Sequence, residues 1–427
     1  MRGMSWQARR TRGLGVVLSA AVLVAGCGGA ASSVDEVVVG LLFPTTGAMA
    51  ALGIDQSNAA RMVLEWANDR GGVGGAKIRI VEGDSRSDPA TGATVAQRMI
   101  DHDGVQIIVG SYASSIAKAI APVAERNHVV LWELGAASPN IAQDGDRYFL
   151  RTVGTSATYA AADIDFLEQY LAPTMSRPLA GLRIAIAHED GPFGTSVADA
   201  IDDLARKKNL NVVANESYAE SSTDLTPVVL RLKQASPDVV LAAPLVASTP
   251  LFWQAARAQD LRLTALIGSA GFSSSTFLDK FGAKGIEGVY DVEPPAMAEM
   301  NTLQFATDAR DMADELRSEF KQRYGHDCLV HCGDGLGGTF VLVEDVLPRT
   351  VKSGHVTGDS IREAANSTNI PDGGTPQGFG VKFDAKGNNE RAESYIMQWQ
   401  SGVLKVVFPA DRAVAEPVFP MPHWNQR

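Results

Sequence analysis

The sequence predicts an α/β protein made of two doubly wound domains, each a mostly parallel sheet flanked by helices. Short apolar runs alternate with helical patterns from residue 37 onward, and the same rhythm starts again near residue 182. The strand-like runs are continuously apolar, as is typical of strands buried on both faces of a sheet. The chain has 427 residues, 45% of them hydrophobic, and this length favours two domains over one.

The first half opens with a strand over 37–43 and a helix over 54–70. Apolar residues from Ala59 to Ala67 follow one face of this helix, and Gly71 ends it. Further strands, with helices between and after them, are expected at 77–81, 105–109 and 128–132.

The second half repeats this order of elements. Its strands are expected at 182–187, 211–218, 238–242 and 263–267, and its helices at 195–207, 224–234 and 248–259.

Three seams divide the chain where strand patterns give way to segments containing Pro and Gly, at 151–154, 290–295 and 378–380. We therefore expect two lobes joined by a three-segment hinge, with a cleft at the carboxyl ends of both sets of strands, where open α/β sheets bind ligands. The first lobe would comprise 37–152 plus 292–378, and the second 153–291 plus 379–427.

The first 26 residues have the pattern of an export signal. Four arginines precede an apolar run of 14 residues, 13–26, which is shorter than the ~20 residues of a membrane-spanning helix. Small residues lead directly into Cys27, which predicts a lipoprotein cleavage box, lipidation of Cys27 and a small polar tether over 27–36. The alternatives are an uncleaved anchor or a secretory signal with an incidental cysteine. All three place the remaining chain outside the cytoplasm.

The charge of the chain argues against some classes of partner. Its net charge is -11, and removing residues 1–26 takes away four arginines and no acids, which leaves -15. An acidic surface repels phosphate backbones and anionic lipids, so we expect no nucleic acid as a partner. Membrane attachment is expected through the acyl chains on Cys27, because no later run approaches ~18 consecutive apolar residues.

Two further cysteines, Cys328 and Cys332, lie in a short cluster that also contains His326 and His331. In an oxidising compartment they could form a disulfide, and the same cluster is also compatible with a zinc site or with two free thiols. One compact cluster lacks the second ligand pair that is typical of zinc motifs, so we predict no metal site.

Three segments that follow expected strands are rich in small and hydroxyl residues. They are 44–47, 110–115 and 135–138. At the start of a helix such segments leave backbone N–H groups free to bind a carboxylate or another anion. The alternative is that Gly, Ser and Thr only cap helices and turn the chain here.

Several short motifs occur in an order and spacing that one protein family shares. They are Pro44-Thr45-Thr46-Gly47 with Leu52-Gly53, the turn Asn68-Asp69-Arg70-Gly71-Gly72-Val73-Gly74-Gly75, Asp84 with Asp88-Pro89, 110–115, Arg151-Thr152, 188–194 and 236–240.

Together these motifs resemble the branched-chain amino acid and amide (Leu/Ile/Val-binding) solute-binding proteins of ABC transporters. The resemblance runs from about residue 37 to 294, with weaker support to 399. It implies the type I periplasmic-binding-protein fold, in which two Rossmann-like domains are joined by a three-segment hinge.

The resemblance also nominates ligand-binding residues. The first-lobe candidates are Leu52, Tyr112, Ser114, Ser115, Gly135, Ala136, Ala137 and Ser138, and the second-lobe candidates are Phe193, Leu245 and Ala270.

This chain departs from relatives that bind α-amino acids. Those relatives place a threonine where Ala137 stands, a tyrosine where Phe193 or Leu245 stands, and an acid for the ammonium where Ala270 stands. The second-lobe wall is therefore expected to lack hydroxyls and a carboxylate, and a buried ammonium without an acid costs several kcal/mol. Either Glu133, Glu189 or Asp190 supplies the acid, or the ligand is a less polar carboxylate or an amide.

The resemblance implies a lipid-anchored, extracytoplasmic solute-binding component of an ABC importer, with permease and ATPase subunits as partners. The alternatives are a ligand-sensing receptor that signals to a membrane regulator, and an enzyme. The sequence shows no G-x-S-x-G, P-loop or H-E-x-x-H motif, so we predict no catalysis and no cofactor. The G-x-G-x-x-G match at 333–338 lacks the strand and the later acid of a dinucleotide site.

Overall fold

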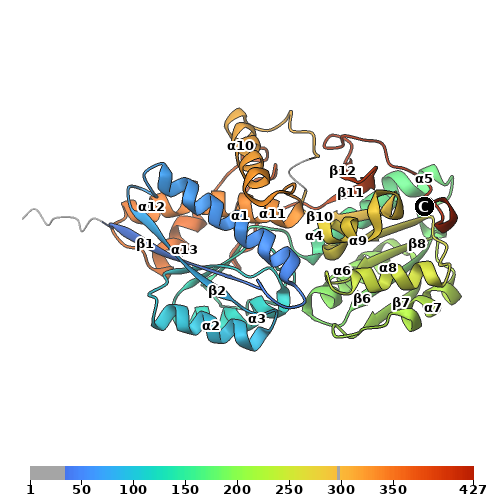
Figure 1. Cartoon of the computed structure of the whole chain (residues 1–427), viewed down its shortest axis with the longest axis horizontal. Coiled ribbons are helices and arrows are strands. Elements are labelled where there is room, and N and C mark those ends of the chain that lie inside the picture. Colours follow the sequence, from blue (N-terminus) through green and yellow to red (C-terminus); the bar gives the residue numbers. More distant parts are fainter. Residues whose placement is uncertain (1–33, 296–298) are drawn as a thin grey trace, which may run out of the picture. The chain divides into compact units, whose positions relative to one another are not determined.

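The computed structural model describes residues 34–295 and 299–427, which belong to one compact unit (Figure 1). The expected export signal, Cys27 and most of the expected tether lie outside the described residues. In the described part of the chain, no helix has both the length and the hydropathy needed to cross a membrane.

The first lobe contains a parallel five-stranded sheet, in which β1, β3, β4 and β5 are largely buried and the edge strand β2 is partly exposed. In sheet order they are β2 (Lys77–Asp84), β1 (Glu36–Phe43), β3 (Ile107–Gly110), β4 (Val130–Glu133) and β5 (Phe149–Arg151). The helices of this lobe are α1 (Ala50–Asp69), α2 (Pro89–Asp101), α3 (Ser114–Arg126), α10 (Thr307–Tyr324), α11 (Val330–Val341), α12 (Leu347–Lys352) and α13 (Gly358–Asn366).

The second lobe contains a seven-stranded sheet in which one strand, β11, runs antiparallel to both of its neighbours and all other pairs are parallel. In sheet order they are β12 (Val403–Phe408), β11 (Tyr395–Gln400), β10 (Tyr290–Glu293), β9 (Ala265–Gly268), β8 (Val239–Ala243), β6 (Arg183–Glu189) and β7 (Asn211–Tyr218). Its helices are α4 (Ser156–Phe166), α5 (Ala172–Thr174), α6 (Pro192–Lys208), α7 (Thr226–Ala235), α8 (Thr249–Ala258) and α9 (Ser275–Ile286).

The chain passes between the lobes after β5, after β10 and before β11. The third passage lies later than the seam expected at 378–380. Phe383 packs edge-on against Trp132 of β4 at 5.5 Å between ring centroids, and Arg151 of β5 bridges Asn388. Residues 381–389 therefore pack on the first lobe, and we place the third crossover after Asn389.

The glycine-rich segment 333–338 lies inside α11, so it is not a nucleotide-binding loop. Its glycines allow close packing instead. A Cβ added at Gly335 would lie 2.6 Å from the Gln56 carbonyl oxygen of α1, and one at Gly338 would collide with Leu134 and Thr152. Gly335 therefore allows the close contact of α11 with α1, and Gly338 allows its close approach to the segments after β4 and β5.

We expect Gly335→Ala to lower the free energy of unfolding by roughly 1–3 kcal/mol, because a backbone carbonyl cannot move aside as a flexible side chain can. Denaturant unfolding measures this. The control is Gly285→Ala, whose added Cβ meets only Phe281, at 3.3 Å. Equal midpoints for the two variants would contradict the packing argument.

Candidate functional site

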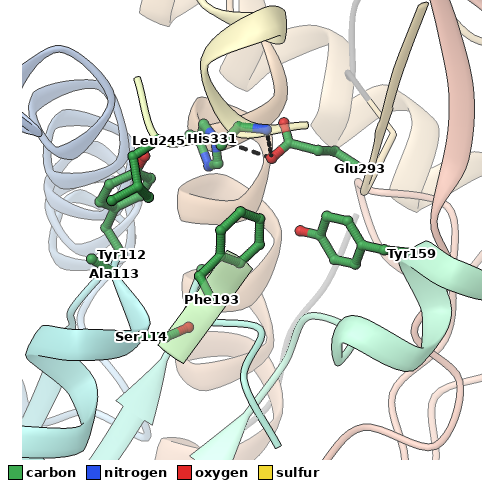
Figure 2. Close-up of a pocket in the computed structure, with 10 residues that line it drawn as sticks. Tyr112, Ala113, Ser114, Tyr159, Phe193, Leu245, Glu293 and His331 are labelled. Atoms are coloured by element: carbon green, nitrogen blue, oxygen red, sulfur yellow. Dashed lines mark hydrogen bonds and ion pairs between the residues drawn. The ribbon is translucent and has the colours of Figure 1, made fainter. Parts of the chain in front are cut away.

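A small cavity lies between the two lobes (Figure 2). Each lining loop of the sheets follows the carboxyl end of a parallel strand, namely β3, β4, β6, β8 or β9, which is where open α/β sheets bind ligands. Apart from Gly135, every lining residue is at least nine-tenths buried, so the cavity lies deep between the lobes. The lining residues are Tyr112, Ala113, Ser114, Gly135, Tyr159, Phe193, Leu245, Ala270, Glu293 and His331.

The cavity brings together six of the residues nominated from sequence: Tyr112, Ser114, Gly135, Phe193, Leu245 and Ala270. Five others do not line it. Leu52 is buried within α1, and the rest stand beside lining residues in the same two loops: Ser115, Ala136, Ala137 and Ser138.

The first of the three expected anion-binding loops has its donors occupied. The Asp84 carboxylate at the end of β2 accepts the N–H groups of Thr45 and Thr46, at 2.9 and 3.2 Å, and the Thr46 hydroxyl at 2.6 Å. These hydrogen bonds lower the pKa of Asp84 against the opposing effect of burial. This loop therefore offers none of those N–H groups to a ligand.

Glu133, at the end of β4, is fully buried and does not line the cavity. One carboxylate oxygen accepts the N–H groups of Leu134, Gly135 and Ala136 at 2.9–3.1 Å. The other accepts the N–H and hydroxyl of Ser111, at 2.7 and 3.0 Å. Burial raises the pKa of Glu133, and these donors offset part of the shift. Glu133 is thus a buried support for two loops, whereas the sequence offered it as one of three acids that could contact a ligand.

Arg151 holds the loop 135–138 through its carbonyl groups, whereas Glu133 holds it through N–H groups. Its guanidinium donates to the carbonyls of Ala136 and Ser138, at 2.8 and 2.7 Å, and to the Asn388 side chain. Burial lowers the pKa of Arg151 to about 10. The loop 135–138 is therefore fixed to the first-lobe segments that lead into the first and third crossovers.

The start of α3 is the open donor site in this lobe. No side chain caps the helix, so the N–H groups of its first turn have no partner within the helix. The Ser114 hydroxyl accepts the N–H of Ser138 at 3.1 Å, which leaves the hydroxyl proton free to be donated into the cavity. A carboxylate or another polar group can bind there.

Glu189 and Asp190, the other acids nominated from sequence, also lie outside the cavity lining. The buried Glu189 carboxylate accepts the N–H groups of Gly191 and Gly194, which begin α6. Asp190 is exposed and accepts the N–H of Glu220 at 3.0 Å. Both side chains order the loop that carries Phe193.

The second-lobe side of the cavity is not wholly apolar, which corrects the expectation that it lacks hydroxyls and a carboxylate. Tyr159 of α4 packs edge-on against Phe193 at 6.1 Å between centroids, and Figure 2 shows its hydroxyl directed towards the cavity. Glu293, at the end of β10, accepts the N–H of Ala270 at 2.8 Å and the hydroxyl of Ser273 at 2.7 Å. The acid missing at Ala270 is thus replaced by one from a neighbouring strand.

His331 enters the cavity from α11. Its Nε2 lies 3.5 Å from Glu293 and its Nδ1 lies 3.6 Å from Asp334. Its ring packs edge-on against Tyr112 at 5.1 Å between centroids. Sequence reasoning noticed His331 only as part of the cysteine cluster. Glu293 could have been nominated, because it ends a strand of an open α/β sheet.

Cys328 and Cys332 are joined by a disulfide, which is one of the three states that the sequence allows for this pair. The bond ties the segment before α11 to the first turn of that helix, next to His331. Within the described ranges, no group of three or more His, Cys, Asp or Glu side chains is arranged to hold a metal ion.

Comparisons with known proteins agree with this geometry. A family model described as periplasmic binding protein matches residues 36–403. The Leu/Ile/Val-binding protein homolog 7 of Brucella abortus (strain 2308) is 32% identical over 405 residues, which covers 94% of this chain and 98% of that protein.

Solved structures share the fold. One is a branched-chain amino acid transporter substrate binding protein from Streptococcus pneumoniae in complex with isoleucine (TM-score 0.73, 17% identity, covering 90% of this chain and 100% of that one). Another is an ABC transporter solute binding protein from R. palustris in complex with benzoate (TM-score 0.72, 18% identity, covering 90% and 98%).

Glu189 should make stability depend on pH. Burial raises its pKa to about 7 from an ordinary value of 4.5, with Glu220 and Asp190 adding repulsion. Between these values the folded state holds a proton that the unfolded chain releases, so stability should fall as pH rises from 4.5 to 7, by up to about 3 kcal/mol.

Denaturant unfolding of wild type and Glu189→Gln across this pH range tests the point. Glutamine can accept only one of the two N–H bonds, so the variant should be less stable throughout, but its stability should vary less with pH. Parallel pH profiles for the two proteins would refute the assignment.

Proposed function

Because the chain belongs to the periplasmic binding protein family, we propose that it is the lipid-anchored solute-binding component of an ABC importer. The observation that carries the proposal is the cavity, which takes its lining from both lobes and from the carboxyl ends of both sheets. Such a cavity can bury nearly all of a small solute only if the lobes separate to admit it.

The sequence of events follows from where the polar groups lie. Ligand docks first on the α3 N-terminus and the Ser114 hydroxyl, both held in place by the network around Glu133. The second lobe then turns about the three crossovers and places Phe193 and Leu245 over the ligand. The closed form presents a new surface to a permease, because residues of both lobes then meet around the ligand.

The first-lobe end of the cavity suits an anionic group. Helix dipoles favour negative charge at an N-terminus, and N–H groups there can bind a carboxylate without a further cation. Attachment to the membrane through Cys27 keeps the protein near its permease. The solute is bound and released unchanged.

A thermal-shift screen of the mature protein against amino acids, amides, aromatic acids and polyamines tests the function. A ligand bound only by the folded state raises the melting temperature. We expect at least one class to do so, and mass spectrometry should recover that ligand chemically unchanged. Conversion of the ligand, or no stabilisation by any class, would contradict the proposal.

Ser114→Ala should weaken binding of the ligand found in this screen by roughly 1–3 kcal/mol, because it removes a buried donor. Calorimetry measures the change. Ser115→Ala is the matched control, since Ser115 is the next residue of α3 and does not line the cavity. Unchanged affinity in Ser114→Ala would place the ligand elsewhere.

A further inference from the structure

One contact in the cavity joins the two lobes directly. Nε2 of His331, on α11 of the first lobe, lies 3.5 Å from Oε1 of Glu293, at the end of β10 in the second lobe. Figure 2 draws this contact as a dashed line. Both side chains are at least nine-tenths buried, so water screens their interaction little. A turn of one lobe against the other changes this distance.

A second carboxyl group lies on the opposite edge of the same ring. Nδ1 of His331 is 3.6 Å from Oδ2 of Asp334, which follows it in α11. The other Asp334 oxygen accepts the Gln377 amide at 2.7 Å. Asp334 therefore stays beside the ring when the lobes move apart, whereas Glu293 leaves with the second lobe.

The two partners of the interlobe contact are each fixed within their own lobe. The Cys328–Cys332 disulfide encloses His331 at the start of α11. The Glu293 carboxylate accepts an N–H and a hydroxyl from the segment after β9, at 2.8 and 2.7 Å. Neither side chain is free to turn away alone, so the contact depends on the angle between the lobes.

The number of protons on the three groups decides whether this contact is a hydrogen bond. A neutral imidazole carries one N–H, so His331 can donate to Glu293 or to Asp334 but not to both. The second carboxylate then faces a bare nitrogen. One further proton, on the ring or on that acid, completes the second hydrogen bond. Neither ring nitrogen has a hydrogen-bond partner among the residues that the structure describes, so both are available for these bonds.

We propose that His331 and Glu293 form a proton-dependent latch between the lobes, in which Asp334 competes for the N–H of the ring. Uptake of one proton completes the bond between Nε2 and Oε1 and favours the closed form without solute. With one proton fewer, the ring keeps its bond to Asp334 in the open form, and closing adds no further bond. The latch rests on the hinge motion of the proposed function and needs no solute to act.

Other titratable groups face this cluster, so the proton belongs to the cluster rather than to one residue. Burial raises the pKa of Glu293 and of Asp334, which favours retention of protons here. The surrounding groups are Asp55 of α1 with His326 beside it, Tyr112 of the β3–α3 loop, Glu133 of β4, Tyr159 and Asp163 of α4, and Asp291 of β10.

The first test follows the lobes in the absence of solute. Small-angle scattering would measure the radius of gyration of the mature protein after bound solute has been removed by unfolding and refolding. Lowering the pH from about 8 to about 5 covers the range in which histidine gains its charge. We expect the ratio of closed to open forms to rise on the order of 10-fold or more, and the radius to fall. A constant radius would overturn the latch.

The second test removes the titrating partners one at a time. His331→Gln and Glu293→Gln should each flatten the dependence of the radius on pH. His326→Gln is the matched control, because this histidine lies 3.4 Å from Asp55 and does not line the cavity. The control should keep the wild-type profile. A profile that survives in His331→Gln, or disappears in His326→Gln, would contradict the proposal.

A third variant changes the profile in the opposite direction, which a poorly folded protein cannot imitate. In Asp334→Asn the amide oxygen can still accept from Gln377, while the amide nitrogen replaces Oδ2 and donates to Nδ1 of His331. The proton of the neutral ring is then placed on Nε2, where it faces Glu293. We expect this variant to be closed already at about pH 8. A radius equal to that of the wild type at this pH would refute the competition by Asp334.

The outcomes separate the latch from solute binding. All three measurements are made without solute, so a failed thermal-shift screen would leave them unchanged. A flat wild-type profile in a protein that a solute does stabilise would overturn the latch and keep the proposed function.

Discussion

The two loops on the first-lobe side of the cavity are held by one buried carboxylate, that of Glu133. It accepts four backbone N–H groups and one hydroxyl from two different strand ends. Arg151 binds the carbonyls of the same region and connects it to Asn388. Removing either charge would leave the other buried without its compensating neighbour, an arrangement that costs several kcal/mol. The position of Ser114 and of the α3 N-terminus depends on this network.

At four strand ends an acidic side chain accepts backbone N–H groups. Asp84, Glu133, Glu189 and Glu293 each end a strand and each accept N–H groups from an adjacent loop. Loops at the carboxyl ends of parallel strands need such acceptors, because their N–H groups have no ladder partner. Where an acid occupies the donors, the loop is fixed and closed to ligand. The uncapped start of α3 is left open, and this contrast is the reason why we propose that helix as the anion-binding end.

The two lobes make unequal contributions to the cavity. The first gives fixed backbone donors on a well-braced loop pair, and the second gives the apolar side chains Phe193 and Leu245 with the polar groups of Tyr159 and Glu293. Apolar contact on closing adds affinity without strict direction, whereas the polar groups set which solutes fit. The disulfide beside His331 fixes the first turn of α11, the element through which the first lobe reaches Glu293.

The sequence by itself determined the fold class and eight of the strands, most of them apolar because a strand buried on both faces of a sheet needs apolar residues throughout. It did not reveal β10, whose four residues include Asp291 and Glu293, the three-residue β5, or the antiparallel pair β11 and β12. The expected strands also located the loops that line the cavity. Open α/β sheets bind ligands at the carboxyl ends of their strands, and the direction of the chain alone says which end that is. Which acids brace loops and which faces the cavity was decided by tertiary structure alone. His331 meets Glu293 because α11 packs in the core beside α1, where Gly335 lies against the Gln56 carbonyl, and no local pattern encodes a contact between distant helices and strands.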